Sequence, residues 1–241
     1  MKQQWEPGDP LRDISPGIWL QDRLWTWGPE SGRDGVAVGC LVPDGFEAYG
    51  RVLHPAARQS EHGIEPVRWS TVASWTGRTV HPLMQFHPVA DLSWPDSPSW
   101  GAPPSNGSLP AAEAHTLVDI LRTFTTTPDR CYLGLWEGFG VPELRAFEAY
   151  PRLQLTHRNY FLFADPIDAV PWLTLGDFHQ SPNLRWPQDR AWVVATEIDG
   201  YDTYVAASTA CIERITADPA LEAFRTTIEA RVDGNGDVIN G

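Results

Sequence analysis

The stretch WVVATEIDGYDTYVAAS, residues 192–208, places two carboxylates, Glu197 and Asp199, beside a turn. Residues two apart in a strand share a face, so both acids are expected on the same side of the chain. Two neighbouring carboxylates can hold a cation or do general acid and base chemistry. They can equally be solvated turn residues, for which Asp is favoured by turn chemistry alone.

The residues around these acids predict a tight hairpin. Gly200 can take a positive φ at the first central position of a type II′ turn over residues 199–202. Counting back from this turn pairs Glu197 with Tyr204 and leaves Asp199 at the tip. A working site then requires a cation between the two acids, supplied by an arginine or a metal, whereas solvated acids require none.

Histidines and arginines elsewhere supply possible partners for the acids. His54, His81 and His87 each precede a proline, which holds the preceding residue extended at the end of an element. Such side chains either finish strands or meet in a cleft with shifted pKa values, as acid and base catalysis requires. The candidate pocket residues are Arg51, His54, Arg68, His81, Glu137, Glu197 and Asp199.

Twelve tryptophans are the most unusual feature of the composition. Trp136, Trp186 and Trp192 lie close in sequence to charged residues. Tryptophan concentrates in binding hot spots and ligand pockets, and it also fills hydrophobic cores. Both interpretations stay open, and the candidate binding residues are extended to Trp136, Trp186, Arg190 and Tyr204.

Motifs that hold metals and cofactors are absent from the sequence. The chain has no Walker loop, no dinucleotide-binding glycine motif, no nucleophile elbow, no His-Glu-x-x-His and no Cys-x-x-Cys. The tail DGNGDV begins like a calcium loop, but Val238 stands where glycine is needed, so we interpret the tail as a frayed terminus. Cys40, Cys131 and Cys211 lie in apolar runs and are expected to be buried free thiols. We expect no metal and no cofactor.

The net charge of the chain disfavours some classes of binding partner. A formal charge of −13 opposes binding to nucleic acid or to an anionic membrane, because both are polyanions. The chain has no apolar run long enough to span a bilayer, and residues 1–17 lack the apolar core of a signal peptide. The expected location is the cytoplasm, and the expected partner is a basic protein or a small molecule.

Strands outnumber helices in the pattern, which predicts a single α+β domain over residues 1–241. Its sheet is expected to be mainly antiparallel, with few helices and long loops rich in proline and tryptophan. Residues 1–35 are expected to form an irregular arm packed on the body, because they combine prolines with tryptophans. Residues 87–108 are expected to form a proline-rich loop.

Alternation, capping residues and turn signals locate the other elements. Strands are expected at 35–42 and 46–54, as a hairpin around PDG, and at 130–138 and 158–164. Helices are expected from an N-cap at Ser108 to Phe124, over 142–150, and from Ser208 with a restart at Asp218.

Five segments resemble a family of uncharacterised actinobacterial cytosolic proteins: YGRVLHPA, RWSTVASWTGRTVHPLMQF, LRTFTTTPDRCYLGLWEGFG, NYFLFADPIDAV and RWPQDRAWVVATEIDGYDTYVAAS. The resemblance runs from about residue 36 to 220. It implies a single domain, and it carries neither an activity nor catalytic residues. A looser likeness, of class only, connects the chain with SMI1/KNR4-type immunity proteins, which are acidic α+β binders.

Two functions fit these observations. The first is a non-enzymatic, immunity-like protein that recognises a basic partner through an acidic, Trp-rich surface. The second is an enzyme or small-ligand binder with a His/Arg/carboxylate pocket lined by Trp. Contact of Arg51 or His81 with Glu197 inside a concave pocket favours the second function, and acids that point into open solvent disfavour it.

Overall fold

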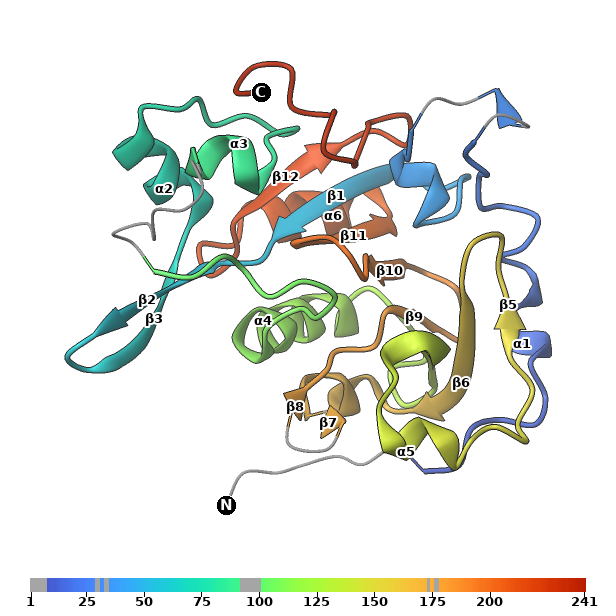
Figure 1. The fold of residues 1–241 in the computed structure, drawn as a ribbon. Coiled ribbons are helices and arrows are strands. Elements are labelled where there is room, and N and C mark those ends of the chain that lie inside the picture. The colour runs from blue at the N-terminus through green and yellow to red at the C-terminus, as the bar shows by residue number, and fades with distance from the viewer. Residues whose placement is uncertain (1–7, 29–30, 33–34, 92–100, 173, 176–177) are drawn as a thin grey trace.

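One large sheet organises the chain, for which a computed structural model describes residues 8–28, 31–32, 35–91, 101–172, 174–175 and 178–241. Every pairing within the sheet is antiparallel, and the strand order is β12, β1, β11, β10, β9, β4, β6, β5 (Figure 1). The strands are β1 (Ala48–Leu53), β4 (Cys131–Trp136), β5 (Leu153–Gln154), β6 (Asn159–Asp165), β9 (Leu184–Pro187), β10 (Val193–Thr196), β11 (Asp202–Ala207) and β12 (Ala223–Thr226). This is the α+β fold with a mainly antiparallel sheet that the sequence predicts.

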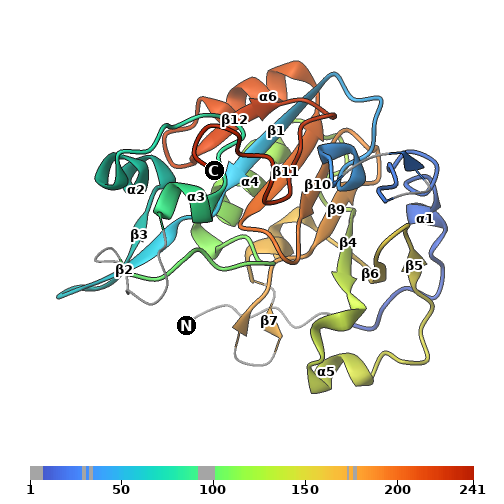
Figure 2. The same cartoon turned by 45° about the horizontal axis from the view of Figure 1, so that its top comes forward.

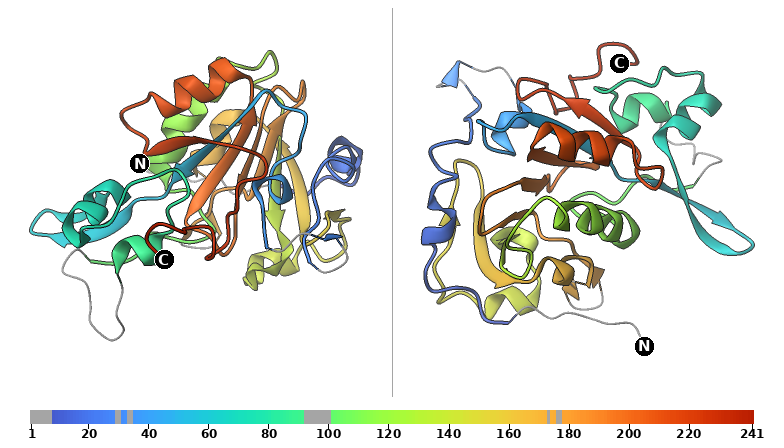
Figure 3. Two further views of the ribbon diagram at one scale, coloured as in Figure 1. Left: turned by 90° about the horizontal axis from the view of Figure 1, so that it is seen from above. Right: turned by 180° about the vertical axis from the view of Figure 1, so that it is seen from behind.

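Both faces of this sheet are covered, so its central strands are buried on both sides. Helices α4 (Ala111–Arg122) and α6 (Thr209–Thr216) pack on one face, which carries Val194 and Val205 (Figures 2 and 3). The opposite face carries Val193 and Tyr204. It packs against the N-terminal arm and the segment 228–232. In the described part of the chain, the ends of the strands therefore remain accessible from solvent.

Three predicted helices form close to their expected positions. Apolar residues at helical spacing, Ala114, Leu117 and Leu121, turn one side of α4 into the core, although the helix begins after Pro110 rather than at Ser108. Helix α6 begins as predicted, since Ser208 Oγ accepts from the Cys211 N–H at 3.3 Å. A short helix, α5 (Pro142–Arg145), lies within the expected range. None of the helices in the described segments is long and apolar enough to cross a membrane.

A smaller layer of helices and a hairpin extends from the end of β1. Helices α2 (Trp69–Thr76) and α3 (Phe86–Ala90) pack together, and the rings of Trp69 and Phe86 meet edge to face at 5.2 Å. The hairpin of β2 (Ala56–Ser60) and β3 (Gly63–Val67) protrudes from the body (Figure 1). The remaining elements are α1 (Ser15–Ile18), η2 (Val38–Cys40), η3 (Glu137–Phe139), η4 (Ile167–Trp172), β7 (Thr174–Leu175) and β8 (Phe178–His179).

Two element predictions are wrong because distant segments compete for the backbone. The range 35–42 contains the 3₁₀ turn η2 instead of a strand, because Val38 N–H donates to Ala230 O and Gly39 N–H donates to Ile228 O, both at 2.9 Å. No hairpin therefore forms around PDG. The helix expected to restart at Asp218 is also wrong, since β12 follows there and pairs with β1.

The two loop-rich regions differ in how far the structure describes them. Within 87–108, the first residues belong to α3, residues 92–100 lie outside the described residues, and residues 101–108 have little regular structure. In the N-terminal arm, Leu11 N–H donates to Leu162 O at 2.6 Å and Leu20 is buried in the core. Residues 1–7, 29–30 and 33–34 of this arm also lie outside the described residues.

The C-terminal tail is anchored, which corrects its interpretation as a frayed terminus. Asp237 is 4% exposed and accepts from His81 Nε2 at 2.8 Å and from the Gln85 N–H at 3.0 Å. It also accepts from the Asn240 N–H at 2.9 Å. Burial opposes its ionisation, but these donors prevail and lower the pKa of Asp237 to about 2. The tail therefore closes over α3 as part of the fold.

The three cysteines are buried and free, as their apolar surroundings predict. Burial raises the pKa of Cys131 and of Cys211 to about 12. Both thiols are therefore protonated at neutral pH and poor nucleophiles.

A buried polar chain crosses the end of the sheet next to α4. Thr196 Oγ1 lies 2.9 Å from Thr203 Oγ1, which lies 2.9 Å from His54 Nε2. His54 Nδ1 lies 3.0 Å from the carbonyl of Ser105, so the neutral ring donates from Nδ1 and accepts at Nε2. Burial is the main cause that lowers the pKa of His54 to about 4.

His54 makes the stability of the protein depend on pH. Because the unfolded chain binds a proton near pH 6.5 and the folded chain only near pH 4, the folded state loses stability as the pH falls through this window. The loss reaches about 3 kcal/mol at most. Urea unfolding at pH 7 and pH 4.5 measures it, and His54→Gln should remove most of this difference.

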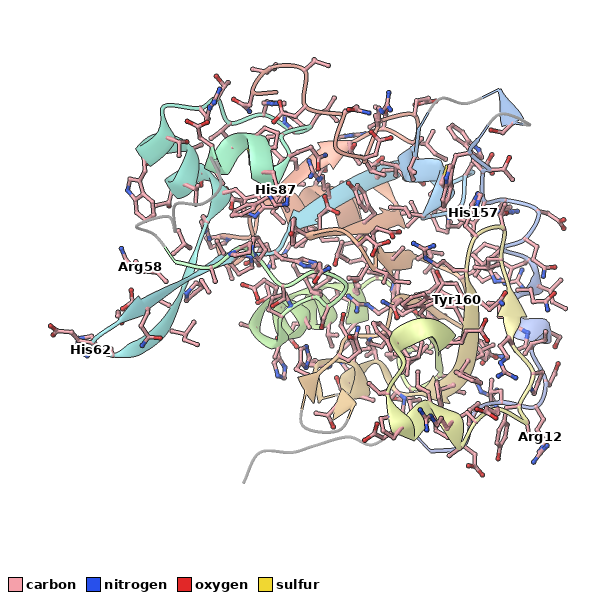
Figure 4. The ribbon with its side chains drawn as sticks, in the orientation of Figure 1. Arg12, Arg58, His62, His87, His157 and Tyr160 are labelled. Atoms are coloured by element: carbon pink, nitrogen blue, oxygen red, sulfur yellow. The ribbon has the colours of Figure 1, made fainter. Side chains whose placement is uncertain are left out.

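The matched control is His62→Gln, since His62 is exposed near the tip of the protruding hairpin (Figure 4). It should keep the pH dependence of the unaltered protein. An undiminished loss of stability in the His54→Gln protein would contradict the assignment.

Candidate functional site

The candidate residues collect at one edge of the sheet because the strands alternate in direction. Strands β1, β4 and β10 run the same way, so their carboxyl ends share an edge with the amino ends of β6 and β11. Residues far apart in sequence are therefore brought together there.

Arg158 is the cation between the two acids of the opening stretch. Its Nη2 donates to Glu197 Oε1 at 3.2 Å and to Asp199 Oδ2 at 3.1 Å. Its guanidinium also lies over the ring of Trp136, 5.7 Å from the centroid. The four-residue connection between β5 and β6, closed by the bond from Leu155 N–H to Arg158 O at 3.0 Å, holds Arg158 at this edge.

The loop that carries the acids differs from the predicted hairpin. Thr196 pairs with Thr203, so residues 197–201 form a five-residue connection instead of a two-residue turn. Gly200 does not take a positive φ. The predicted pairing of Glu197 with Tyr204 is wrong, because Ala195 faces Tyr204. In the longer loop both carboxylates face Arg158, an arrangement that a two-residue turn does not impose.

The two acids differ in how deeply their side chains are buried. The side chain of Glu197 is 23% exposed and that of Asp199 is 80% exposed. Burial raises the pKa of Glu197, although Arg158 opposes this shift. Burial and the charge of Glu197 also raise the pKa of Tyr160. Protonation of Glu197, or binding of a cationic ligand to it, therefore changes the charge of a largely buried environment.

A cavity of about 670 Å³ opens beside this ion pair. Its volume falls within the range of about 300 to 1,000 Å³ that is usual for small-molecule sites. The lining combines aromatic rings, four carboxylates and one arginine. The residues that the argument uses are Trp27, Tyr201, Arg158, Glu197, Asp199 and Asp233.

The floor of the cavity is a buried ion pair. Arg51 Nε donates to Asp202 Oδ2 at 2.7 Å, and the Tyr204 hydroxyl donates to the same oxygen at 3.1 Å. Arg51 Nη1 donates to the carbonyls of Pro82 and Met84, both at 2.9 Å. Asp202 and Tyr204 line the cavity, while Arg51 lies behind them. The floor is therefore rigid and its charges are paired.

The structure brings some of the sequence candidates together and separates others. Glu197, Asp199 and Tyr204 line the cavity, Trp136 contacts it through Arg158, and Arg51 supports it. Neither Arg51 nor His81 contacts Glu197, because Asp202 and Asp237 hold them.

Five other candidates lie elsewhere. Glu137 accepts from Arg152 Nε at 3.1 Å, beside a different, smaller cavity. His54 belongs to the buried polar chain, and Trp186 is fully buried in the core. Arg68 donates to the carbonyl of Pro219. The exposed Arg190 lies over the ring of Trp19, 4.8 Å from its centroid.

The sequence reading missed the central residue of the site. Arg158 and Glu197 are 39 residues apart, and only the strand order makes them neighbours. The available signal was the position of Arg158 directly before an apolar strand. In the structure the amino end of this strand, β6, lies at the same edge of the sheet as the carboxyl end of β10, with β9 and β4 between them. Trp27 and Asp233 were missed because the arm and the tail that carry them have no regular pattern.

Within the described residues no group of three or more His, Cys, Asp or Glu side chains is placed to hold a metal ion. Comparison of the chain with protein families, with curated proteins and with solved structures finds no match. The geometry of the cavity is therefore the basis for a function.

The two acids should differ in their effect on stability. Replacing Glu197 with Gln removes a half-buried partner of Arg158 and should lower the free energy of unfolding by about 1 to 3 kcal/mol. Asp199→Asn should change it by no more than about 0.5 kcal/mol, because Asp199 is exposed. Chemical denaturation of the two single variants measures the difference. Equal and negligible effects would show that Arg158 does not hold Glu197.

Proposed function

We propose that this protein binds a small organic cation with an aromatic or other apolar body in the cavity beside Arg158. The observation that carries the proposal is the composition of the cavity wall. Four carboxylates, Glu197, Asp199, Asp202 and Asp233, line the cavity, against one guanidinium. Aromatic rings lie among them, and faces of aromatic rings attract cations.

Pairing within the protein leaves a negative charge at the mouth. The charge of Asp202 is compensated by Arg51. The charge of Asp233 is compensated by Arg231, whose Nε donates to Asp233 Oδ1 at 2.6 Å. Arg158 alone serves both Glu197 and Asp199, so this group carries one excess negative charge. A cationic ligand that approaches Asp199 gains an attraction that a carboxylate ligand lacks.

The aromatic part of the cavity favours an apolar body on the ligand. Trp27 stacks on His157, with ring centroids 3.2 Å apart, and Tyr201 lies against Phe86 at 5.7 Å. These rings are fixed by their neighbours, so little side-chain entropy is lost when a ligand packs on them.

The protein-binding interpretation remains a second proposal, supported by the net charge of −13. The Trp-rich surface that this interpretation requires has less support. Of the described tryptophan side chains, only Trp75 is exposed, while Trp69, Trp186 and Trp192 are buried and Trp19, Trp25, Trp27 and Trp136 are half-buried. A basic partner would have to use the acidic mouth of the cavity or other acidic residues.

Binding of matched probes tests the proposal. 2-Phenylethylammonium, 2-phenylethanol and 3-phenylpropionate share a phenyl-ethyl body and differ in charge. Isothermal titration calorimetry should show the ammonium binding at least about tenfold more tightly than the carboxylate. Asp199→Asn should weaken the ammonium by about three- to tenfold, because the charge at the mouth is lost.

The matched control is Glu143→Gln, which removes an exposed acid on α5, outside the cavity wall. It should leave the affinity for the ammonium unchanged. Failure of all three probes to bind would contradict a small-ligand site of this kind, and tighter binding of the carboxylate would identify Arg158 as the recognition group instead.

A further inference from the structure

Arg185 is a fully buried arginine on the face of the sheet opposite the cavity. It lies in β9, between Leu133 of β4 and Val194 of β10. Directly paired residues share a face, and Leu133 and Val194 belong to the core beneath α4 and α6. The side chain of Arg185 is therefore placed within this core and has no exposed surface.

None of the nitrogens of its guanidinium is satisfied. Nε, Nη1 and Nη2 are buried and have no hydrogen-bond partner. No described carboxylate forms an ion pair with Arg185. Arg51 is equally buried yet bonds to Asp202 and to two carbonyls, which shows how this fold treats an arginine whose partners are in place. Buried charges without partners are rare because removing a cation from water is costly.

The groups near Arg185 supply no negative charge. Burial lowers the pKa of Arg185 to about 9, so the guanidinium is still protonated at pH 7. Cys131, whose thiol interacts electrostatically with Arg185, has its pKa raised to about 12 by burial and is neutral. His54 is neutral as well. One uncompensated positive charge therefore stays in the core.

The hydroxyl groups on the same face of the sheet as Arg185 are already paired within the protein, since Thr196 donates to Thr203 and Thr203 donates to His54 Nε2. Thr196 and Thr203 lie on the same face of the sheet as Arg185, since Thr196 is two residues from Val194 and pairs with Thr203. Both threonines are buried. Water can satisfy the donors of Arg185, but only an anion satisfies the donors and the charge together.

We propose that Arg185 forms a second, internal binding site, which takes a small monovalent anion such as a halide or a formate-sized carboxylate. The planar guanidinium presents paired N–H donors, which match a carboxylate with two parallel hydrogen bonds. The site is separate from the cavity beside Arg158, because the two lie on opposite faces of the sheet.

Thermal melting in different sodium salts tests the site. At constant ionic strength in HEPES buffer, chloride or formate is exchanged for gluconate, which is far larger than either of these anions. The melting temperature should rise and saturate, by about 5 °C, as chloride or formate replaces gluconate. Arg185→Met should abolish this rise, while Arg225→Met, which removes an exposed arginine of β12, should keep it.

A melting temperature of the unaltered protein that does not respond to the anions would overturn the proposal. So would an equal rise in the Arg185→Met protein, because that result marks a general salt effect. If Arg185→Met does not fold, crystals of the unaltered protein grown in bromide decide the matter. An anomalous peak within hydrogen-bond distance of the guanidinium is expected, and its absence at full occupancy of other bromide sites would overturn the proposal.

Discussion

The site depends on one guanidinium that two carboxylates share. Arg158 approaches from the amino end of β6, and Glu197 and Asp199 approach from the connection between β10 and β11. Without this contact the two loops have no reason to stay together at the edge of the sheet. With it, the loops form one wall of a cavity, and the second acid leaves an excess negative charge at the mouth.

The position of the cavity follows from the coverage of the sheet. Helices cover one face, and the arm and the tail cover the other, so the strand ends provide the accessible polar groups. The tail has a double role. Asp237 anchors it to α3, and Val232 to Gly234 supply part of the cavity wall. Stability of the tail and shape of the site are therefore linked, since a released tail removes one side of the cavity.

Local pattern was sufficient to predict the fold class and several elements. Strands at Cys131–Trp136 and Asn159–Asp165, and the helices around Leu117 and after Ser208, depend on alternation, helical spacing and caps that act within a few residues. The sheet order, the strand β12 and the 3₁₀ turn at Val38 depend on partners far away in the chain. No local pattern contains that information.

The same limit applies to the candidate site. Sequence reasoning singled out Glu197 and Asp199 and required a cation between them, but it sought that cation in Arg51 and His81. The structure satisfies Arg51 and His81 with the nearer carboxylates Asp202 and Asp237. It places Arg158 between the acids because the amino end of β6 and the carboxyl end of β10 lie at the same edge of the sheet, two strands apart. Residue type showed the chemistry that was needed, and topology selected the residue that supplies it.

A double-mutant cycle between Arg158 and Glu197 tests most directly that their contact holds the site together. The free energies of unfolding of Arg158→Met, Glu197→Gln and the double variant are compared with that of the unaltered protein. The contact predicts a coupling of about 1 to 2 kcal/mol, with the double variant less destabilised than the sum of the single variants. Effects that add to within about 0.3 kcal/mol would contradict it.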